Sequence, residues 1–296
     1  MVLDTAAAHD AVAGEIGSRL SLSAEMAALG VVEMVDENMA NAARVHAIES
    51  GKTYDGRTLI AFGGGGPVHA CRVAEKIGID RVLVPSGAGV GSAIGFLRAP
   101  VGYEVVRSLY QRFSTFDVDA VNTLLAEMQA EAMQVVAAAG FGVATTETRT
   151  AFMRYVGQGH EIPVPLPVCV LTVDDVAAVR AAYDAEYTRF YDRPVPGSDV
   201  EVMGYAVVVA TVTEDAAVSN ASLVAESDAA PNGTRLVRDT TSGEVASWSV
   251  FDRSSQAPGA CIIGPAIIAE DETSTLVGPG WRARLNAQGY LLLTRE

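Results

Sequence analysis

The chain has 296 residues, and its excess of acidic over basic side chains gives a formal net charge of −15. Hydrophobic residues make up 49% of the chain and charged residues 19%, which allows a sizeable core and excludes a chain that is disordered as a whole. The negative charge argues against attraction to nucleic acid or to anionic lipid. We therefore expect no nucleic acid and no membrane among the partners.

The spacing of the cysteines and the pattern of apolar segments predict a cytoplasmic protein. Cys71, Cys169 and Cys261 are far apart and form no CxxC pair, which argues against a disulfide scaffold or a zinc knuckle and suits a reducing compartment. We see no charged-then-apolar leader and no apolar run long enough to span a bilayer.

The first third of the chain begins with helices. Residues 6–19 are rich in alanine and predict a helix, and a longer helix is predicted from Ser23, a suitable N-cap, to about Gly51. Its methionines and valines recur at helical spacing. We interpret this methionine stripe as core packing rather than as a ligand surface.

A strand, a glycine run and a helix follow, in the segment LIAFGGGGPVHACRVAEKIGIDRVLVP. We predict a buried strand at 59–62, a helix from Pro67 to Ile77 that stops at Gly78, and a second strand in RVLVP. A further small-residue helix starts near Gly89. This alternation predicts a parallel crossover in an α/β fold.

The composition changes after Arg107. Between 108 and 213 we predict an α+β region, with one helix capped near Asp117 and another capped by Thr172. Residues 214–232 read as a linker or long loop, and short strands separated by Gly, Pro and Asn follow. The predicted domains are therefore 1–107, 108–213 and 214–296, the last a small β-rich unit after its linker.

The glycine run raises a specific chemical expectation. A strand that leads through glycines into a helix N-terminus presents free N–H groups and a helix dipole, which favour an anion or a nucleotide. Two common templates do not match. The loop is not a Walker A loop, because no Gly-Lys-Ser/Thr follows it, and the dinucleotide pattern needs a glycine where Val68 or His69 stands. The alternative is a tight structural turn.

Four stretches together resemble one family. The glycine segment and the following VLVPSGAGVGSAIG, the helix AEMAALGVVEMVDENMANAARV, the phrase MRYVGQGHEIPVPLP and the final GPAIIAEDETSTLVGPGW occur in the order found in the hydantoinase A / 5-oxoprolinase / acetone carboxylase β-subunit family. The chain is similar to this family from about residue 24 to its end.

The resemblance implies a fold and a nucleotide site. The family's nucleotide domain resembles the actin, sugar kinase and Hsp70 ATPases, so the fold class expected is α/β, with a partial lobe of that type. Gly63, Gly64, Gly65, Gly66 and Pro67 would form the adenosine loop, with Asn38 and Arg44 as further candidate contacts to the base or ribose. The alternative for the later small residues, Gly91–Ala93, is close helix packing, which we favour.

The resemblance also implies missing parts. The family's Asp-x-Gly-Gly-Thr phosphate loop and its second phosphate loop are absent, so this chain looks like the C-terminal part alone. In the family, ATP is thought to phosphorylate an amide or enolate oxygen before ring hydrolysis or carboxylation. We expect ATP with Mg²⁺ as cofactor, a partner chain that carries the N-terminal half, a hydantoinase B-like subunit, and little activity of this chain alone. The alternative is a non-catalytic scaffold or regulatory subunit.

Several single residues have two readings. For His69 a structural role is favoured over a phosphate contact, and Cys71 reads as core. His160 and Glu161 could line a substrate or subunit interface, but no third partner indicates a metal site. We interpret Arg154 and Gln158 as buried polar struts that join domains, and the acidic run 270–272 as a solvated turn. We assign no catalytic residue.

Overall fold

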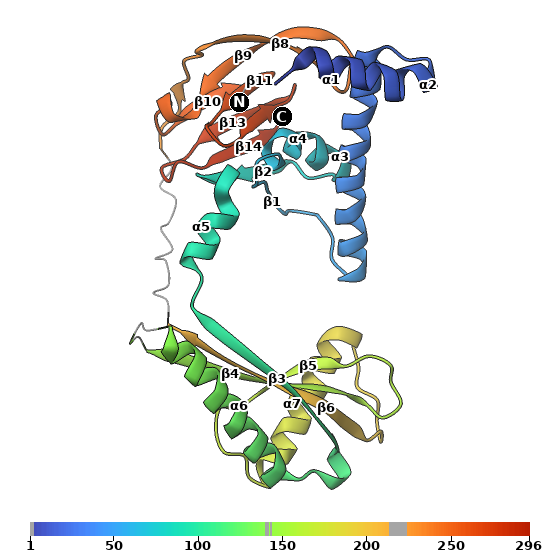
Figure 1. The fold of residues 1–296 in the computed structure, drawn as a ribbon, viewed down its shortest axis with the longest axis vertical. Coiled ribbons are helices and arrows are strands. Elements are labelled where there is room, and N and C mark those ends of the chain that lie inside the picture. Colours follow the sequence, from blue (N-terminus) through green and yellow to red (C-terminus); the bar gives the residue numbers. More distant parts are fainter. Residues whose placement is uncertain (1–2, 140–141, 143, 213–223) are drawn as a thin grey trace. The chain divides into compact units, whose positions relative to one another are not determined.

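A computed structural model of the chain describes residues 3–139, 142, 144–212 and 224–296. The chain forms two units, one made of Met1–Leu97 together with Val218–Glu296, and the other of Arg98–Ala217 (Figure 1). The second unit is thus inserted into the sequence of the first.

The first unit combines helices from its early segment with strands from both segments. Its helical elements are α1 (Thr5–Val12), η1 (Ala13–Gly17), α2 (Ser18–Leu20), α3 (Ala24–Glu49), α4 (Gly66–Ile77), η2 (Ala88–Val90), α5 (Gly91–Arg98) and η4 (Arg253–Ser255). Its strands are β1 (Leu59–Ile60), β2 (Arg81–Val84), β7 (Ser227–Asp228), β8 (Gly233–Arg238), β9 (Val245–Asp252), β10 (Ala260–Ile263), β11 (Ala266–Ala269), β12 (Ser274–Val277), β13 (Trp281–Leu285) and β14 (Leu291–Arg295).

Two sheets and α4 enclose the core of this unit. One sheet has the order β1-β2-β14-β13-β10-β7, and the other has the order β12-β11-β9-β8. The predicted parallel crossover is confirmed, because β1 pairs in parallel with β2 and α4 connects them. Val82, Trp281 and Leu293 are almost fully buried in one apolar cluster that also includes the inner face of α4.

The ends of α4 follow from the sequence as predicted. Pro67 lies in the first turn, where its missing N–H leaves no hydrogen bond unmade, and Gly78 ends the helix with a left-handed φ of 78°. Cys71 is 6% exposed, so its interpretation as a core residue is confirmed.

The three-part division of the sequence differs from the observed units. β14 lies between β2 and β13, with Leu293 opposite Val82, so the residues after 224 share main-chain hydrogen bonds and a core with the early segment. They do not form a β-rich unit of their own. Local hydrophobic patterning marks strands but does not say which strands pair across two hundred residues.

The helix α3 also differs from its interpretation. Ser23 caps it as predicted, with Ser23 Oγ accepting from Met26 N at 3.2 Å. The methionine stripe, however, is not core: Met26, Met34 and Met39 are 44%, 61% and 39% exposed. Small residues such as Ala40 and a charged residue, Asp36, occupy the buried side of the helix instead.

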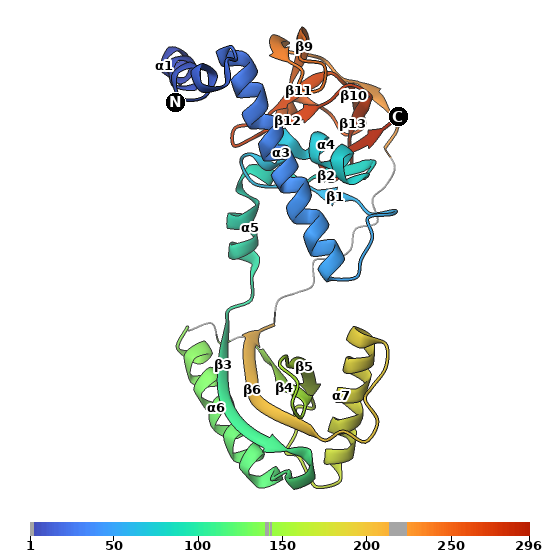
Figure 2. The ribbon, with the colours of Figure 1, turned by 90° about the vertical axis from the view of Figure 1, so that its right-hand side faces the viewer.

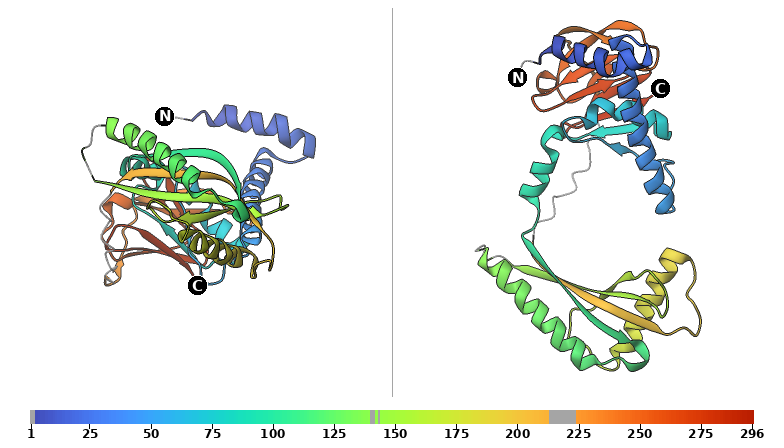
Figure 3. Two further views of the ribbon diagram at one scale, coloured as in Figure 1. Left: turned by 90° about the horizontal axis from the view of Figure 1, so that it is seen from below. Right: turned by 45° about the vertical axis from the view of Figure 1, so that its right-hand side comes forward.

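The second unit is an α+β arrangement, as predicted for this region. Its elements are β3 (Gly102–Arg112), η3 (Phe113–Thr115), α6 (Val118–Ala138), β4 (Thr145–Tyr155), β5 (Ile162–Leu166), α7 (Asp175–Tyr191) and β6 (Val200–Thr211). The strands form an antiparallel sheet in the order β3-β6-β4-β5, and α6 and α7 pack against it around one core (Figures 2 and 3). Asp117 caps α6 as predicted, whereas α7 starts after Asp174 and Thr172 instead bonds the carboxylate of Asp175.

Candidate functional site

The glycine loop, residues 63–66, joins β1 to α4 and is held from two sides. Gly63 has a φ of 93°, which favours glycine, and its N–H donates to the carbonyl of Ala88 at 2.7 Å. Thr273 Oγ1 donates to the carbonyl of Gly64 at 2.9 Å. The loop is therefore fixed in position by η2 and by the turn that precedes β12.

The other three glycines of the loop have neither of the usual structural reasons to be glycine. None of Gly64, Gly65 and Gly66 has a positive φ. A Cβ on Gly65 would meet nothing within 4 Å, and on Gly64 and Gly66 the nearest atoms would be at 3.8 and 4.0 Å. Gly64 and Gly65 are exposed. The bare backbone is thus open to an approaching group.

The neighbouring Gly89 shows the opposite case. A Cβ there would lie 2.4 Å from Glu272 Cβ and 2.8 Å from the Glu272 carbonyl. This glycine is required by packing inside the unit. A Cβ added to Gly91 would lie 3.5 Å from the Phe62 side chain, which is an ordinary contact distance. Ser92 and Ala93 are exposed.

A small apolar cavity adjoins the loop. Its volume is about 170 Å³, and it is lined by Met39, residues 59–62, Gly66, His69, Ala70 and Val73. Drug-sized ligands occupy about 300–1,000 Å³, so this cavity has room for one ring system rather than for a whole nucleotide. His69 is the one ionisable side chain in this lining.

A buried carboxylate holds His69 in place. His69 Nδ1 lies 2.7 Å from Asp36 Oδ1, and the Asp36 side chain is 2% exposed. Burial raises the pKa of Asp36 above its ordinary value, and the hydrogen bond with His69 opposes that shift. The contact with Asp36 occupies Nδ1 and leaves Nε2 for a ligand or for solvent.

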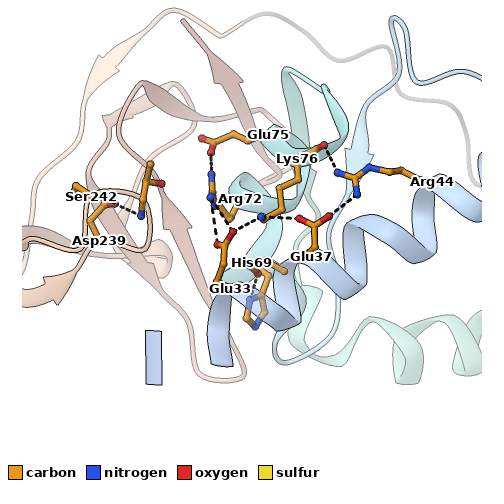
Figure 4. Close-up of polar contacts among 11 residues, drawn as sticks. Glu33, Glu37, Arg44, His69, Arg72, Glu75, Lys76, Asp239 and Ser242 are labelled. Atoms are coloured by element: carbon orange, nitrogen blue, oxygen red, sulfur yellow. Dashed lines mark hydrogen bonds and ion pairs between the residues drawn. The ribbon is translucent and has the colours of Figure 1, made fainter. Parts of the chain in front are cut away.

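An ion-pair network joins α3 to α4 behind this histidine (Figure 4). Glu33 pairs with Arg72 and Lys76, and Glu37 accepts from Lys76 at 3.0 Å and from Arg44 at 2.7 Å. The hydrogen bond from Lys76 is the main cause that lowers the pKa of Glu33, and the one from Arg44 does so for Glu37.

The structure brings some of the predicted site residues together and not others. Gly66 and His69 line the cavity, and Gly63–Gly65 lie in the same loop. Arg44 does not line it, because its guanidinium binds Glu37 and donates to the carbonyl of Lys76 at 2.8 Å. Asn38 is exposed on another side of α3 and also lies outside the lining. Pro67 is buried in the first turn of α4.

The candidate residues of the second unit act inside that unit. Arg154 Nε donates to Glu201 Oε1 at 2.7 Å, and Gln158 Nε2 donates to the Tyr187 hydroxyl at 2.7 Å. Both residues join elements of this one unit and do not join two domains, and the Arg154 side chain is 25% exposed rather than buried. His160 and Glu161 are exposed.

The acidic run 270–272 contains a residue that sequence reasoning placed wrongly. Glu270 is not a solvated residue: it pairs with Arg253 at 2.7 Å, and the two side chains are 11% and 8% exposed. Arg253 also donates to the carbonyls of Val84 and Gly289. Together with Thr273, this pair fixes the turn beside the glycine loop. No local sequence signal links residues so far apart.

Among the described residues, no group of three or more His, Cys, Asp or Glu side chains is placed to hold a metal ion. No helix among the same residues has the length and apolar character needed to cross a membrane.

The fold and the site define a mixed α/β protein with several sheets and a candidate ligand-binding turn. Family models give this class a name: the hydantoinase/oxoprolinase model matches residues 1–105, and the hydantoinase/oxoprolinase C-terminal domain model matches residues 114–295. The chain therefore belongs to the hydantoinase/oxoprolinase family, as its motifs indicated.

Individual relatives agree with this assignment. The chain is 29% identical to caprolactamase subunit alpha of Pseudomonas jessenii, 27% to acetone carboxylase beta subunit of Xanthobacter autotrophicus and 27% to 5-oxoprolinase 1 of Arabidopsis thaliana. These matches cover 99%, 96% and 99% of this chain but only 43%, 41% and 24% of the relatives. The chain thus spans less than half the length of the relatives it matches.

Solved structures show the same fold. The crystal structure of the ATP-dependent caprolactamase from Pseudomonas jessenii superposes with a TM-score of 0.73 at 28% identity, over 99% of this chain and 43% of that one. A nucleotide-free structure of acetone carboxylase gives a TM-score of 0.74 at 24% identity, also over 99% of this chain and 43% of the other, and indicates the fold alone.

Proposed function

We propose that this chain provides the nucleoside-binding part of an ATP-dependent enzyme that activates a cyclic amide, a hydantoin or a ketone for hydrolysis or carboxylation. The relatives support this class, since one is an ATP-dependent caprolactamase and another an acetone carboxylase subunit. The nucleotide lobe is proposed to be of the actin, sugar kinase and Hsp70 type. A cytoplasmic location stays a prediction.

The observation that carries the proposal is the open backbone of Gly64–Gly66. Neither a positive φ nor packing requires glycine at these positions. A flat ligand group that lies against the main chain would require it, because a Cβ would be in its way. The adjacent apolar cavity of about 170 Å³ suits part of a purine nucleoside, and His69 offers one polar contact there. These residues fit the base of a nucleoside.

The same residues do not provide for the phosphates. Neither lysine nor arginine lines this cavity, and the nearby turn carries Glu270, Asp271 and Glu272. Bound ATP would supply the phosphoryl group that makes an amide or enolate oxygen reactive, and such transfer needs Mg²⁺ and donors on the phosphates. We propose that a chain with the family's N-terminal half supplies them, and that a hydantoinase B-like subunit acts with it.

Calorimetric titration of the chain with ADP tests the nucleoside site. Because this chain would provide only one side of the nucleotide site, we expect it to bind ADP weakly, with a Kd on the order of 0.1–1 mM. We expect no Mg²⁺-dependent ATP hydrolysis by this chain alone. Gly65→Val is expected to weaken ADP binding at least tenfold while the fold stays intact, because a Cβ there meets nothing.

Gly233→Val is the matched control, since Gly233 also has no neighbour within 4 Å and no positive φ but lies in β8. Equal loss of affinity in both variants would contradict the site. Absence of ADP binding, both alone and with the partner present, would favour the non-catalytic scaffold instead.

A further inference from the structure

The sheet of the second unit carries a row of charged side chains on the face opposite its core. Val200 and Val202 of β6 belong to the core, so strand alternation places Glu201, which lies between them, on the other face. The residues that pair with Glu201 in the two neighbouring strands are Arg112 of β3 and Arg154 of β4. Three charged side chains therefore lie side by side across three strands.

Glu201 is the fixed point of this row. Its side chain is 6% exposed, and both of its carboxylate oxygens have partners. Arg154 Nε donates to Oε1 at 2.7 Å, and the Tyr110 hydroxyl donates to Oε2 at 2.9 Å. A buried polar group whose hydrogen bonds are all made is held rigidly. Glu201 therefore keeps the groups bonded to it in set positions.

The same contacts orient both arginines. Arg154 is bound directly to Glu201, whereas Arg112 Nε donates to the Tyr110 hydroxyl at 3.2 Å and is held through it. Each guanidinium thus uses its inner nitrogen, Nε, for the network. Within the part of the chain that the structure describes, the Nη1 and Nη2 atoms of Arg112 and Arg154 have no hydrogen-bond partner. These four donor nitrogens are left for a group outside the network.

A second carboxylate near the row is already engaged elsewhere. Asp199 acts electrostatically on Arg112, but its oxygens accept from Ser114 Oγ at 2.7 Å and from Val200 N at 2.9 Å. These hydrogen bonds direct the charge of Asp199 away from the guanidinium. The outer nitrogens of Arg112 thus stay open to an anion.

The sheet next to the row leaves space for the rest of a ligand. Further along β6, Gly204 lies between Ser108 of β3 and Phe152 of β4. A Cβ on Gly204 would lie 2.9 Å from the carbonyl of Arg107, so the close approach of β3 requires glycine there. A molecule that extends over Gly204 meets the ring of Phe152 at its side and no side chain beneath it.

We propose that Arg112 and Arg154 bind one oxyanion, the carboxylate or phosphate group of a small-molecule ligand. Guanidinium groups bind such groups through paired, charge-assisted N–H···O bonds that the planar fork of arginine matches. Tyr110 and Glu201 are positioning residues, because they touch the arginines and not the ligand. All four residues belong to the second unit, so this site goes beyond the nucleoside-binding function proposed for the glycine loop of the first.

Nuclear magnetic resonance of the full chain with ¹⁵N-labelled arginine tests the site. Sodium phosphate and sodium citrate are titrated separately, and sodium chloride keeps the ionic strength constant. The Nε–H signals of Arg112 and Arg154 should shift together and saturate with one Kd, on the order of 1–10 mM, for at least one of the two anions. Saturation by phosphate alone identifies a phosphate ligand, and saturation by citrate alone identifies a carboxylate ligand.

Two variants separate an ordered site from simple charge attraction. Arg112→Gln removes two of the free donor nitrogens but leaves the bond from Arg154 to Glu201 in place, and it should weaken binding by at least about fivefold. Tyr110→Phe keeps every charge but removes the hydroxyl that holds Arg112, and it should weaken binding by at least about threefold.

Arg189→Gln is the matched control for charge. Arg189 also lies in the second unit and is exposed, but its partner is Glu186 of the same helix. Its loss should leave the binding of both anions unchanged. The Nε–H signal of Arg149, which pairs with Glu147 within β4, should stay constant in all three variants and shows that the sheet is intact.

Four results would overturn the proposal. The first is that neither anion shifts the signals of Arg112 and Arg154. The second is that Arg189→Gln weakens binding as much as Arg112→Gln, and the third is that Tyr110→Phe binds as the wild type does. The fourth is a loss of phosphate binding in Gly65→Val, because the anion would then lie at the glycine loop.

Discussion

Two long helices of this molecule, α6 and α3, use their apolar residues in opposite ways. In α6, Val121, Leu125 and Met128 are at most 1% exposed and form the core of the second unit with its sheet. In α3, Met34 and Val45 are more than half exposed, and charged residues face the neighbouring helix instead. The comparison teaches that the apolar side chains of α6 complete the core of its unit, whereas those of α3 lie at the surface of theirs.

The largest expected effect tests this contrast directly. Leu125→Ala should lower the free energy of unfolding by about 2–5 kcal/mol, because it leaves a cavity in a closed core. Met34→Ala should change it by less than about 0.5 kcal/mol, because the side chain is 61% exposed. Urea unfolding followed by circular dichroism measures both. Similar losses in the two variants would remove the distinction between the helices.

Charge burial gives a smaller and pH-dependent contrast. Glu201 is 6% exposed and binds Arg154 and the Tyr110 hydroxyl. Burial alone would raise the pKa of Glu201, but these hydrogen bonds hold it below its ordinary value of 4.5. A lowered carboxyl pKa gives stability that is fully present above the unfolded value and is lost as the pH falls through the folded one.

Glu201→Gln should therefore cost about 1–3 kcal/mol at pH 7, and this cost should shrink below about pH 4.5. Glu37→Gln in the exposed network of α3 should cost less than Glu201→Gln at pH 7, because solvent screens its ion pairs. Chemical unfolding at pH 7 and pH 3.5 compares them. A cost of Glu201→Gln that stays constant with pH would refute the role assigned to its charge.

The last contrast lies within the glycine loop. Gly63→Ala should cost about 1–2 kcal/mol, because a φ of 93° is strained for a residue with a Cβ. Gly65→Ala should be neutral or slightly stabilising, since an added Cβ has open space there. Thermal unfolding of the two variants decides whether only Gly63 is required by the backbone. A clear loss in Gly65→Ala would contradict the open-backbone description.

The sequence predicted what local chemistry determines. The N-caps Ser23 and Asp117 and the end of α4 at Gly78 follow from side-chain capping and from glycine's tolerance of positive φ. The family followed from motifs in a fixed order, which the family models confirm.

What failed depended on partners distant in the sequence. Apolar periodicity showed that α3 has an apolar stripe but not whether that stripe is covered, and it gave no sign that Glu270 meets Arg253. The donors of Arg44 bind Glu37 and the carbonyl of Lys76, and whether Arg44 also contacts a ligand stays a prediction. Whether Asn38 or the loop glycines contact a nucleoside stays a prediction.

The place of β14 in its sheet has a consequence for how the chain folds as it leaves the ribosome. Residues 291–295 lie between β2 and β13, so the six-stranded sheet stays divided until residues 291–295 have been synthesised. The inserted segment 98–217 is contiguous and can form its tertiary structure earlier, as domains generally do during translation. Until then α4 and β2 lack the strands that cover them, so the nascent first unit exposes apolar surface that the finished unit buries.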